Sequence, residues 1–275
     1  MRPHGDKIDA LLRNASFASK QDKLQEIQAR YMAWRAAVEG ISDRSHPAIK
    51  RLTEQLNAYK DFIDDPRHKQ RASGFSAQTF LHSSVLEEFL VVVFSLLLIG
   101  MDVAAGGKNT YVEMKFRPRN LSDFLAAPPI AITTKDQDFA IGRSVSIVCG
   151  YDDKATRTMQ AFVPLLCLEC KTNFDKTMYT AASDTARCVK QGAPACFFAV
   201  VIETKDLARD FNLQGSSIDQ LYWLRHPDRN HSSMTIENRS KIDANPVQIL
   251  YDNVAGHLKK TWFDLDKGEK TGVLI

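Results

Sequence analysis

Apolar side chains recur three or four residues apart over residues 21–40 and form one stripe along the segment. The stripe consists of Leu24, Ile27, Tyr31, Trp34 and Val38. This spacing predicts an amphipathic helix with one buried face. A second helix is predicted from about Pro47 to Phe62, because proline suits the first position of a helix. Residues 1–72 are therefore expected to form a helical N-terminal region that contacts a partner or DNA.

The next apolar stretch, residues 76–100, predicts one long buried helix that carries the adjacent acids Glu87 and Glu88. Two interpretations of these acids stay open. Ser84 and Glu87 have the spacing of a capping box if the helix begins near Ser84. If the helix begins earlier, one glutamate projects from its middle toward whatever the core contains, which would include a metal site.

Beyond residue 100 the apolar runs become shorter and are typical of strands. The predicted strands are residues 110–116, 136–148, 163–171 and 195–202. The second and third of these are expected to pair antiparallel. A helix that ends near Gln191 separates the third strand from the fourth, and this spacing predicts a crossover unit with a parallel pair.

The connecting segments carry weaker signals. Gly106 to Asn109 predict a turn. Residues 206–275 begin as a polar, turn-rich segment with a short helix near residues 218–224, and they end in an amphipathic helix that opens at Pro246. We expect this loop-rich segment and its C-terminal helix to pack on a core formed by residues 73–205.

The apolar run at residues 165–171 ends abruptly in Glu169-x-Lys171. Residues two apart on a strand share a face, so the carboxylate of Glu169 and the ammonium of Lys171 are expected to point the same way. Leu168 and Cys170 would point the other way, into a core. Charged groups at the end of a buried strand are costly unless something uses them. The use that we expect is a divalent metal held by the glutamate, with the lysine aimed at an attacking water or a phosphate.

The composition is that of an ordinary globular protein, with 44% hydrophobic and 25% charged residues in a chain of 275. The net charge of +3 excludes a basic field over the whole molecule, so any nucleic-acid surface must be local. Five cysteines, an odd number, argue against a disulfide framework and indicate a reducing cytoplasm. The most apolar run, residues 89–99, is about half of what a bilayer crossing needs, so no membrane segment is expected.

The order of these features resembles the PD-(D/E)xK nuclease core, which has a helix with an acid, a strand that begins with Asp, a strand that ends in Glu-x-Lys, and a crossover helix with its strand. The runs 83–89 and 169–178 resemble more closely the heterodimeric type II restriction endonucleases of the BbvCI kind. The resemblance covers roughly residues 75–205. It implies an α/β fold of the α+β type, in which a mixed central sheet is flanked by helices and residues 73–205 form the catalytic core.

The resemblance also implies the catalytic residues. Glu169 and Lys171 match the second acid and the lysine of the family motif. The first acid is assigned to Asp138, which directly enters the apolar strand. Gln137 stands where the family often has proline, and this departure keeps Asp136 as a rival to Asp138.

The cofactor implied by the resemblance is Mg²⁺, which prefers a few carboxylate oxygens together with waters and substrate oxygens. Asp138 and Glu169 would supply carboxylates, the backbone carbonyl of Cys170 a further ligand, and Glu88 a ligand to a second metal. Lys171 would orient the attacking water, help to deprotonate it or hold the scissile phosphate.

Double-stranded DNA is the substrate that this family implies, and a few basic residues are candidates to contact it. These are Lys115, Arg117, Arg119, Arg225 and Arg229. The first three could equally lie on a solvated edge strand, and the last two on a surface loop. Cys167 and Cys170 have the spacing of zinc ligands, but they would face opposite sides of a strand, so a zinc site is not expected.

The function implied is a restriction endonuclease subunit that cuts one strand of an asymmetric double-stranded site. A related subunit in a heterodimer, or a second copy of the chain, would cut the other strand. Two other functions stay open, namely a structure-specific repair or resolvase nuclease with the same core, and a non-catalytic DNA-binding subunit on a degenerate core.

Overall fold

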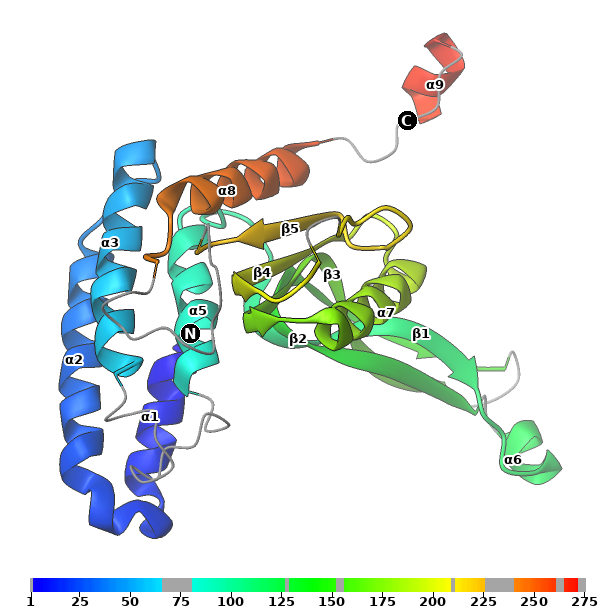
Figure 1. The fold of residues 1–275 in the computed structure, drawn as a ribbon. Helices are drawn as coiled ribbons and strands as arrows, with labels where there is room; N and C mark the ends of the chain where they lie inside the picture. Colours follow the sequence, from blue (N-terminus) through cyan, green and yellow to red (C-terminus); the bar gives the residue numbers. More distant parts are fainter. Residues whose placement is uncertain are drawn as a thin grey trace.

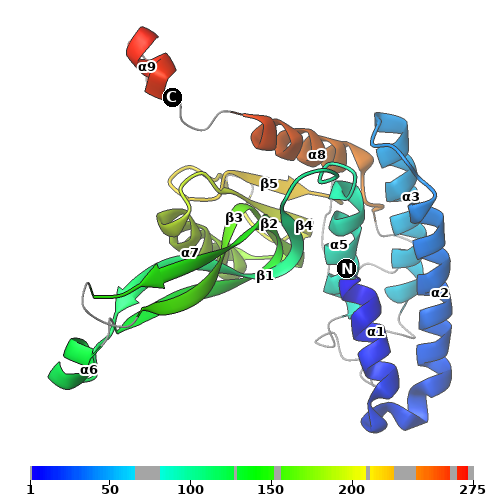
Figure 2. The same ribbon diagram turned by 180° about the vertical axis from the view of Figure 1, so that it is seen from behind.

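The computed structural model describes residues 2–65, 81–126, 129–151, 156–208, 211–225, 240–260 and 265–271. A five-stranded sheet forms the centre of the molecule (Figure 1). Helix α7 (Lys176–Gly192) covers one face, and helices α5 (Leu81–Phe94) and α8 (Ala244–Lys259) cover the other (Figures 1 and 2). The predicted mixed sheet with flanking helices and a helical N-terminal region is therefore confirmed.

The five strands lie in the sheet in the order of the chain. They are β1 (Ala104–Phe116), β2 (Ile130–Cys149), β3 (Arg157–Phe174), β4 (Phe197–Lys205) and β5 (Gln220–Trp223). The pairs β1–β2 and β2–β3 are antiparallel, whereas β3–β4 and β4–β5 are parallel. Helix α7 connects β3 to β4, so the predicted antiparallel pair and the crossover unit are both confirmed.

Alternation along β2 and β3 divides the apolar side chains between two cores. Phe139 and Leu168 pack under α5 and α8, whereas Ala140 and Cys167 pack under α7. The long strand β2 approaches β3 very closely at Gly142, where a Cβ atom would lie 2.2 Å from a backbone oxygen of β3. Only glycine allows this approach, which coincides with a shift of register between β2 and β3.

The N-terminal helices stand beside α5 (Figures 1 and 2). They are α1 (Pro3–Arg13), the short 3₁₀ helix η1 (Ala15–Lys20), α2 (Gln21–Glu39) and α3 (His46–Ile63). Every residue of the stripe predicted at 21–40 is buried in the same core cluster as α5. This core continues from the N-terminal helices to the sheet. The division of the chain at residues 72 and 205 remains a prediction.

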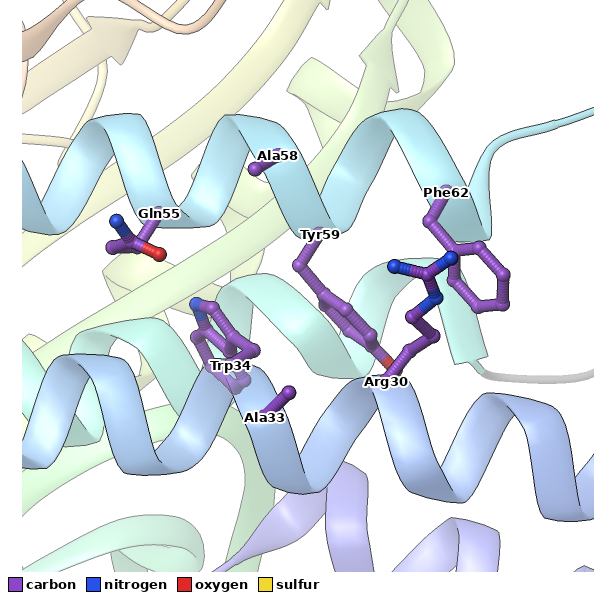
Figure 3. Close-up of a pocket in the computed structure, with 7 residues that line it drawn as sticks. All are labelled: Arg30, Ala33, Trp34, Gln55, Ala58, Tyr59 and Phe62. Atoms are coloured by element: carbon purple, nitrogen blue, oxygen red, sulfur yellow. The ribbon is translucent and has the colours of Figure 1, made fainter.

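Helices α2 and α3 meet through an aromatic contact. The ring of Trp34 stacks on that of Tyr59 with centroids 5.4 Å apart, and the Arg30 guanidinium lies 5.4 Å from the ring centroid of Phe62. A shallow groove runs beside these side chains (Figure 3). No carboxylate, histidine or cysteine from the described part of the chain lines it, so we assign it to helix packing and not to chemistry.

A buried ionic cluster ties α3 to the sheet. Lys60 Nζ lies 2.6 Å from Glu203 Oε1 on β4 and 3.6 Å from Asp64 at the end of α3. Arg225, which follows β5, donates from Nε to Glu203 Oε2 at 2.9 Å. Each of these four residues is 3% exposed or less. Among the described residues, these two cations and two carboxylates pair with one another inside the protein.

Several local predictions were wrong. Residues 106–109 form no turn but lie within β1, where the positive φ of Gly106, 111°, accompanies a bulge. The short helix predicted at 218–224 is the strand β5. Ser84 lies inside α5 and donates to the carbonyl of Leu81, so the capping-box interpretation is wrong. The helix α9 (Leu265–Thr271) was not predicted.

Two expectations about the chain's environment can be compared with the structure. All five cysteines are free thiols, in agreement with the absence of a disulfide framework. Over the described ranges, no helix combines the length and the apolar character that a membrane crossing requires.

Candidate active site

The three predicted catalytic side chains meet at one point, at the edge where β2 and β3 stop pairing. The last paired residues are Phe139 and Leu168. Continuing this register by one residue places Asp138 opposite Glu169, and Lys171 lies two residues further along β3. Because side chains alternate along a strand, all three project from the same face of the sheet.

A single ammonium group joins the two carboxylates. Lys171 Nζ donates to Glu169 Oε1 at 2.8 Å and to Asp138 Oδ2 at 3.2 Å. The same Asp138 oxygen accepts the backbone N–H of Cys170 at 2.7 Å. The prediction that both acids and the amine converge is therefore confirmed in geometry.

The Cys170 N–H is available to Asp138 because the β2–β3 ladder has already ended. A backbone donor at that position would otherwise need another partner. The carboxylate of Asp138 thus accepts the N–H group that a carbonyl of the ladder would otherwise accept. This hydrogen bond fixes the orientation of the carboxylate. Asp136, its rival as the first acid, lies on the exposed part of β2 opposite Asn109 and makes no hydrogen bond to Lys171 within the described structure.

Burial and neighbouring charges shift the pKa values of Glu169 and Lys171. Burial raises the pKa of Glu169, and the nearby Asp138 raises it further. Burial alone would lower the pKa of Lys171, but the carboxylates of Glu169 and Asp138 outweigh it and raise that pKa above its usual value. Lys171 is therefore an ammonium that joins two carboxylates.

An open cleft surrounds these groups, and two of the lysines that line it, Lys7 and Lys108, were not predicted. Lys7 of α1, Glu87 of α5 and Lys108 of β1 line it together with Asp138 and Lys171. Asp136 also lines the cleft, and the charge of Lys135 acts on the nearby Glu169. The sequence offered a signal for Glu87, which is next to Glu88, but none for Lys7, because its place depends on how α1 packs.

Glu88 does not belong to this cleft, so its assignment as a metal ligand was wrong. It is fully buried on the other side of α5, where its carboxylate accepts the backbone N–H groups of His4 and Gly5 and the hydroxyl of Tyr31. Arg35 forms an ion pair with it at 3.2 Å. The adjacent Glu87 faces the cleft instead, and burial raises the pKa of its carboxyl group.

The predicted basic cluster on β1 lies away from the cleft. Lys115 follows Asn109, which lines the cleft, by six residues, or about 20 Å along a strand. Lys115 pairs with Glu113 at 2.5 Å, and Arg119 pairs with Asp123 of helix α6 (Leu121–Ala126) at 3.0 Å. Arg117 is exposed at the same end. These residues form an arm that ends in α6 (Figure 1).

Arg225 is not a surface residue, so its assignment as a DNA contact was wrong. It is 1% exposed and belongs to the buried cluster with Glu203 and Asp64. Its Nη1 group also donates to the carbonyl of Ser240 at 2.6 Å. The other candidate of that segment, Arg229, lies outside the described residues.

The chemistry of the donor set fits a hard divalent cation. Asp138 and Glu169 are oxygen donors that already share one positive group, as a shared metal would require. Cys170 points its thiol into the core under α5, so only its backbone could serve as a ligand, and Cys167 faces the opposite core, as predicted. In the described ranges no three His, Cys, Asp or Glu side chains converge closely enough to enclose a metal.

Gln137 is a second indication that the cleft is built to receive a ligand. It lines the cleft and is 4% exposed, yet neither its amide nitrogen nor its amide oxygen has a hydrogen-bond partner in the described protein. An unsatisfied buried amide costs on the order of 1–3 kcal/mol. Such a cost is typical of groups that find their partner in a bound state or in ordered water.

Comparisons with known proteins agree with this geometry. Residues 78–266 match the family model described as Bpu10I restriction endonuclease. The chain is also similar in fold to a chain of the native BbvCI A2B2 tetramer, with a TM-score of 0.77 and 18% identity, over 94% of this chain and 98% of that one. No curated protein sequence matches the chain.

Proposed function

Because the chain belongs to the Bpu10I restriction endonuclease family, we propose that it hydrolyses one phosphodiester bond in one strand of a double-stranded DNA site, with Asp138, Glu169 and Lys171 as its catalytic residues. The observation that carries this proposal is the meeting of the two carboxylates at one ammonium. The family supports double-stranded DNA as the substrate. The convergence of the three side chains supports the choice of catalytic residues.

Asp138, Glu169 and the backbone carbonyl of Cys170 are the groups that would hold Mg²⁺. When bound, the ion would lower the pKa of a water molecule and stabilise the negative charge that develops on the phosphate. Asp138 is already oriented for this role by the Cys170 N–H. Glu87 takes the place that was first given to Glu88, since it is the helix acid that faces the cleft.

Lys171 has a separate task. Both the diester and its transition state are anionic, so hydrolysis depends on neutralising charge and on placing water in line with the leaving group. Its Nζ atom lies within hydrogen-bond distance of both carboxylates, next to the position of the proposed ion. We therefore assign Lys171 to binding the scissile phosphate, orienting the attacking water or helping to deprotonate it.

A second active site is required to cut both strands. The described part of this chain brings together one Glu-x-Lys centre, which can act on one strand at a time. We therefore propose that the chain works with a related subunit or with a second copy of itself. The similar BbvCI chain comes from an A2B2 tetramer, which is consistent with such an assembly. The five free thiols fit the reducing cytoplasm, where DNA cleavage would take place.

The test is cleavage of plasmid DNA by the purified chain in Mg²⁺, with and without the product of the neighbouring gene. We expect nicking or cutting at a defined site, loss of activity with a chelator, and no activity in Asp138→Asn. Cutting that follows branched or damaged DNA and ignores sequence would replace the proposal with a structure-specific nuclease. DNA binding without cleavage, with the neighbouring gene product present, would identify a non-catalytic subunit.

A further inference from the structure

The tip of the arm that ends in α6 exposes large apolar side chains. Phe116 at the end of β1, Leu121 and Phe124 of α6, and Val148 near the end of β2 are each between 44% and 70% exposed. None of the four belongs to either core, and α6 buries none of its residues. The tip projects away from the rest of the molecule (Figures 1 and 2). We call these four side chains the arm patch.

Contacts between its own elements order the tip. The side-chain oxygen of Asn120 accepts the backbone N–H of Asp123 at 2.8 Å and so caps α6. Tyr151, which follows β2, donates its hydroxyl to the carbonyl of Phe124, and the two rings meet edge to face with centroids 6.2 Å apart. These contacts join the end of β2 to α6. The arm patch therefore lies on a fixed surface, which lowers the entropy that binding of a partner would cost.

Charges of both signs surround the arm patch. The charged residues in the described parts of 113–134 and 144–162 are Lys115, Arg117, Arg119, Arg157, Glu113 and Asp123. Lys115 with Glu113 and Arg119 with Asp123 form ion pairs, so two of the four cations are already engaged within the arm. An apolar centre with a rim of both signs is typical of a protein interface, whereas the backbone of DNA calls for cations.

The arm patch has about the size that a stable protein contact needs. Its four side chains offer on the order of 400 Å² of apolar surface, which is within the range of the largest patches on monomers, and such patches are often functional. A standard interface buries about 800 Å² on each partner, and a little more than half of this area is apolar. The arm patch thus supplies most of the apolar share of one such interface.

We propose that the arm patch of one chain binds the arm patch of a second copy in a two-fold contact. Apolar surfaces need no opposite charge to match each other, so the same patch can serve on both sides, as two-fold symmetry requires. The end of β1 lies about 20 Å along the strand from Asn109, which lines the cleft, so this contact leaves both clefts open. This inference rests on the proposed function, because a chain with one described active site needs a second to cut both strands.

The test is sedimentation equilibrium of the purified chain without DNA or metal, at several salt concentrations. Leu121→Lys and Val148→Lys each place a cation within the arm patch, on two different elements. Ile99→Lys is the matched control, because Ile99 is 73% exposed and lies between α5 and β1, outside the arm. All three side chains are exposed, so the variants should keep the fold, and thermal unfolding of each variant checks this.

We expect the natural chain to form dimers whose dissociation constant stays the same or falls as the salt concentration rises, because salt screens the excess positive charge of the two arms. Leu121→Lys and Val148→Lys should raise this constant at least about 30-fold, the effect of a central interface residue, and Ile99→Lys should leave it unchanged. A monomeric natural chain, or dimers that both arm variants leave intact, would overturn the inference.

Other partners of the arm would give different results. Tighter binding of duplex DNA by both arm variants, with a monomeric natural chain, would assign the arm to DNA. Loss of binding to the product of the neighbouring gene, again with a monomeric natural chain, would assign it to a related subunit, and either result overturns the contact between copies. Because the mass is measured without DNA, a dimer that cuts no DNA contradicts only the proposed function, and a monomer that cuts DNA contradicts only this inference.

Discussion

The molecule contains two clusters of acids and cations that use the same residue types for different ends. In the first, Lys60, Asp64, Glu203 and Arg225 are buried and pair with one another. In the second, the carboxylates of Asp138 and Glu169 meet at Lys171 beside an open cleft. A buried cluster of this kind holds elements of the fold together, whereas two carboxylates that meet beside an open cleft can receive an added cation.

The largest effect should come from the centre of the second cluster. Lys171→Met keeps the aliphatic stem and removes the ammonium that joins Asp138 to Glu169. We expect Mg²⁺-dependent cleavage of plasmid DNA to fall by at least about 10³-fold, as is usual for loss of a group that acts in the transition state. Residual cleavage within tenfold of the natural protein would contradict the role of Lys171.

The buried cluster should respond in stability and not in chemistry. Glu203→Ala leaves Lys60 and Arg225 buried without their main partner, and removal of one member of such a cluster costs about 3–5 kcal/mol. The measurement is unfolding by denaturant. The exposed pair of Lys241 with Asp61 provides the control, since Lys241→Ala should cost no more than about 1 kcal/mol. Equal costs for the two variants would remove the distinction between the clusters.

The adjacent glutamates of α5 allow a sharper comparison within one helix. Glu88→Gln weakens the charged hydrogen bonds to His4, Gly5 and Tyr31, and we expect it to lose about 1–3 kcal/mol of unfolding free energy. Glu87→Gln should keep its stability but change the cleavage rate, because Glu87 faces the cleft. The free energy of unfolding and the cleavage rate are measured on both variants. If both substitutions change these two quantities in the same way, the distinction between Glu87 and Glu88 is wrong.

The smallest effect concerns the pH dependence of stability. The pKa of Glu169 is raised in the folded protein, so between its unfolded and folded values the folded state binds the extra proton. The stabilising effect of that proton is complete below the unfolded value and is lost as the pH rises through the folded value. We expect Glu169→Gln to melt no lower than the natural protein at pH 7–8.

The difference in melting temperature between these two proteins should shrink as the pH falls through the raised pKa of Glu169 toward its ordinary value. Scanning calorimetry over that range measures it. A variant that melts several degrees lower at neutral pH would indicate that the ion pair with Lys171 outweighs the cost of burying Glu169.

The features that the sequence predicted correctly are those that depend on local pattern. Strand alternation placed Glu169 and Lys171 on one face. The sequence placed Asp138 at the start of its strand, but β2 begins at Ile130, so Asp138 lies within β2, next to the point where β2 stops pairing with β3. Helical spacing likewise predicted the buried stripe of α2. Each of these inferences needs only neighbours within one or two elements.

The features that the sequence could not give depend on contacts between distant segments. The choice between Glu87 and Glu88 is decided by the packing of α1 on α5, since His4 lies 84 residues before Glu88. Arg225 looked like a surface arginine because its partner Glu203 lies on a different strand, and the cluster closes only through Lys60, 143 residues before Glu203. The local sequence around a charged residue in a loop-like segment does not show that its oppositely charged partner lies in the core.

The hydrogen bonds between α1 and Glu88 have a practical meaning for work with this protein. The main-chain N–H groups of residues 4 and 5 are committed to an interior carboxylate, so additions or deletions within this first turn would disturb a helix that borders the reactive centre. The far end of the chain offers a safer place for affinity tags or fluorescent labels, because α9 stands clear of the sheet and of the N-terminal helices (Figures 1 and 2).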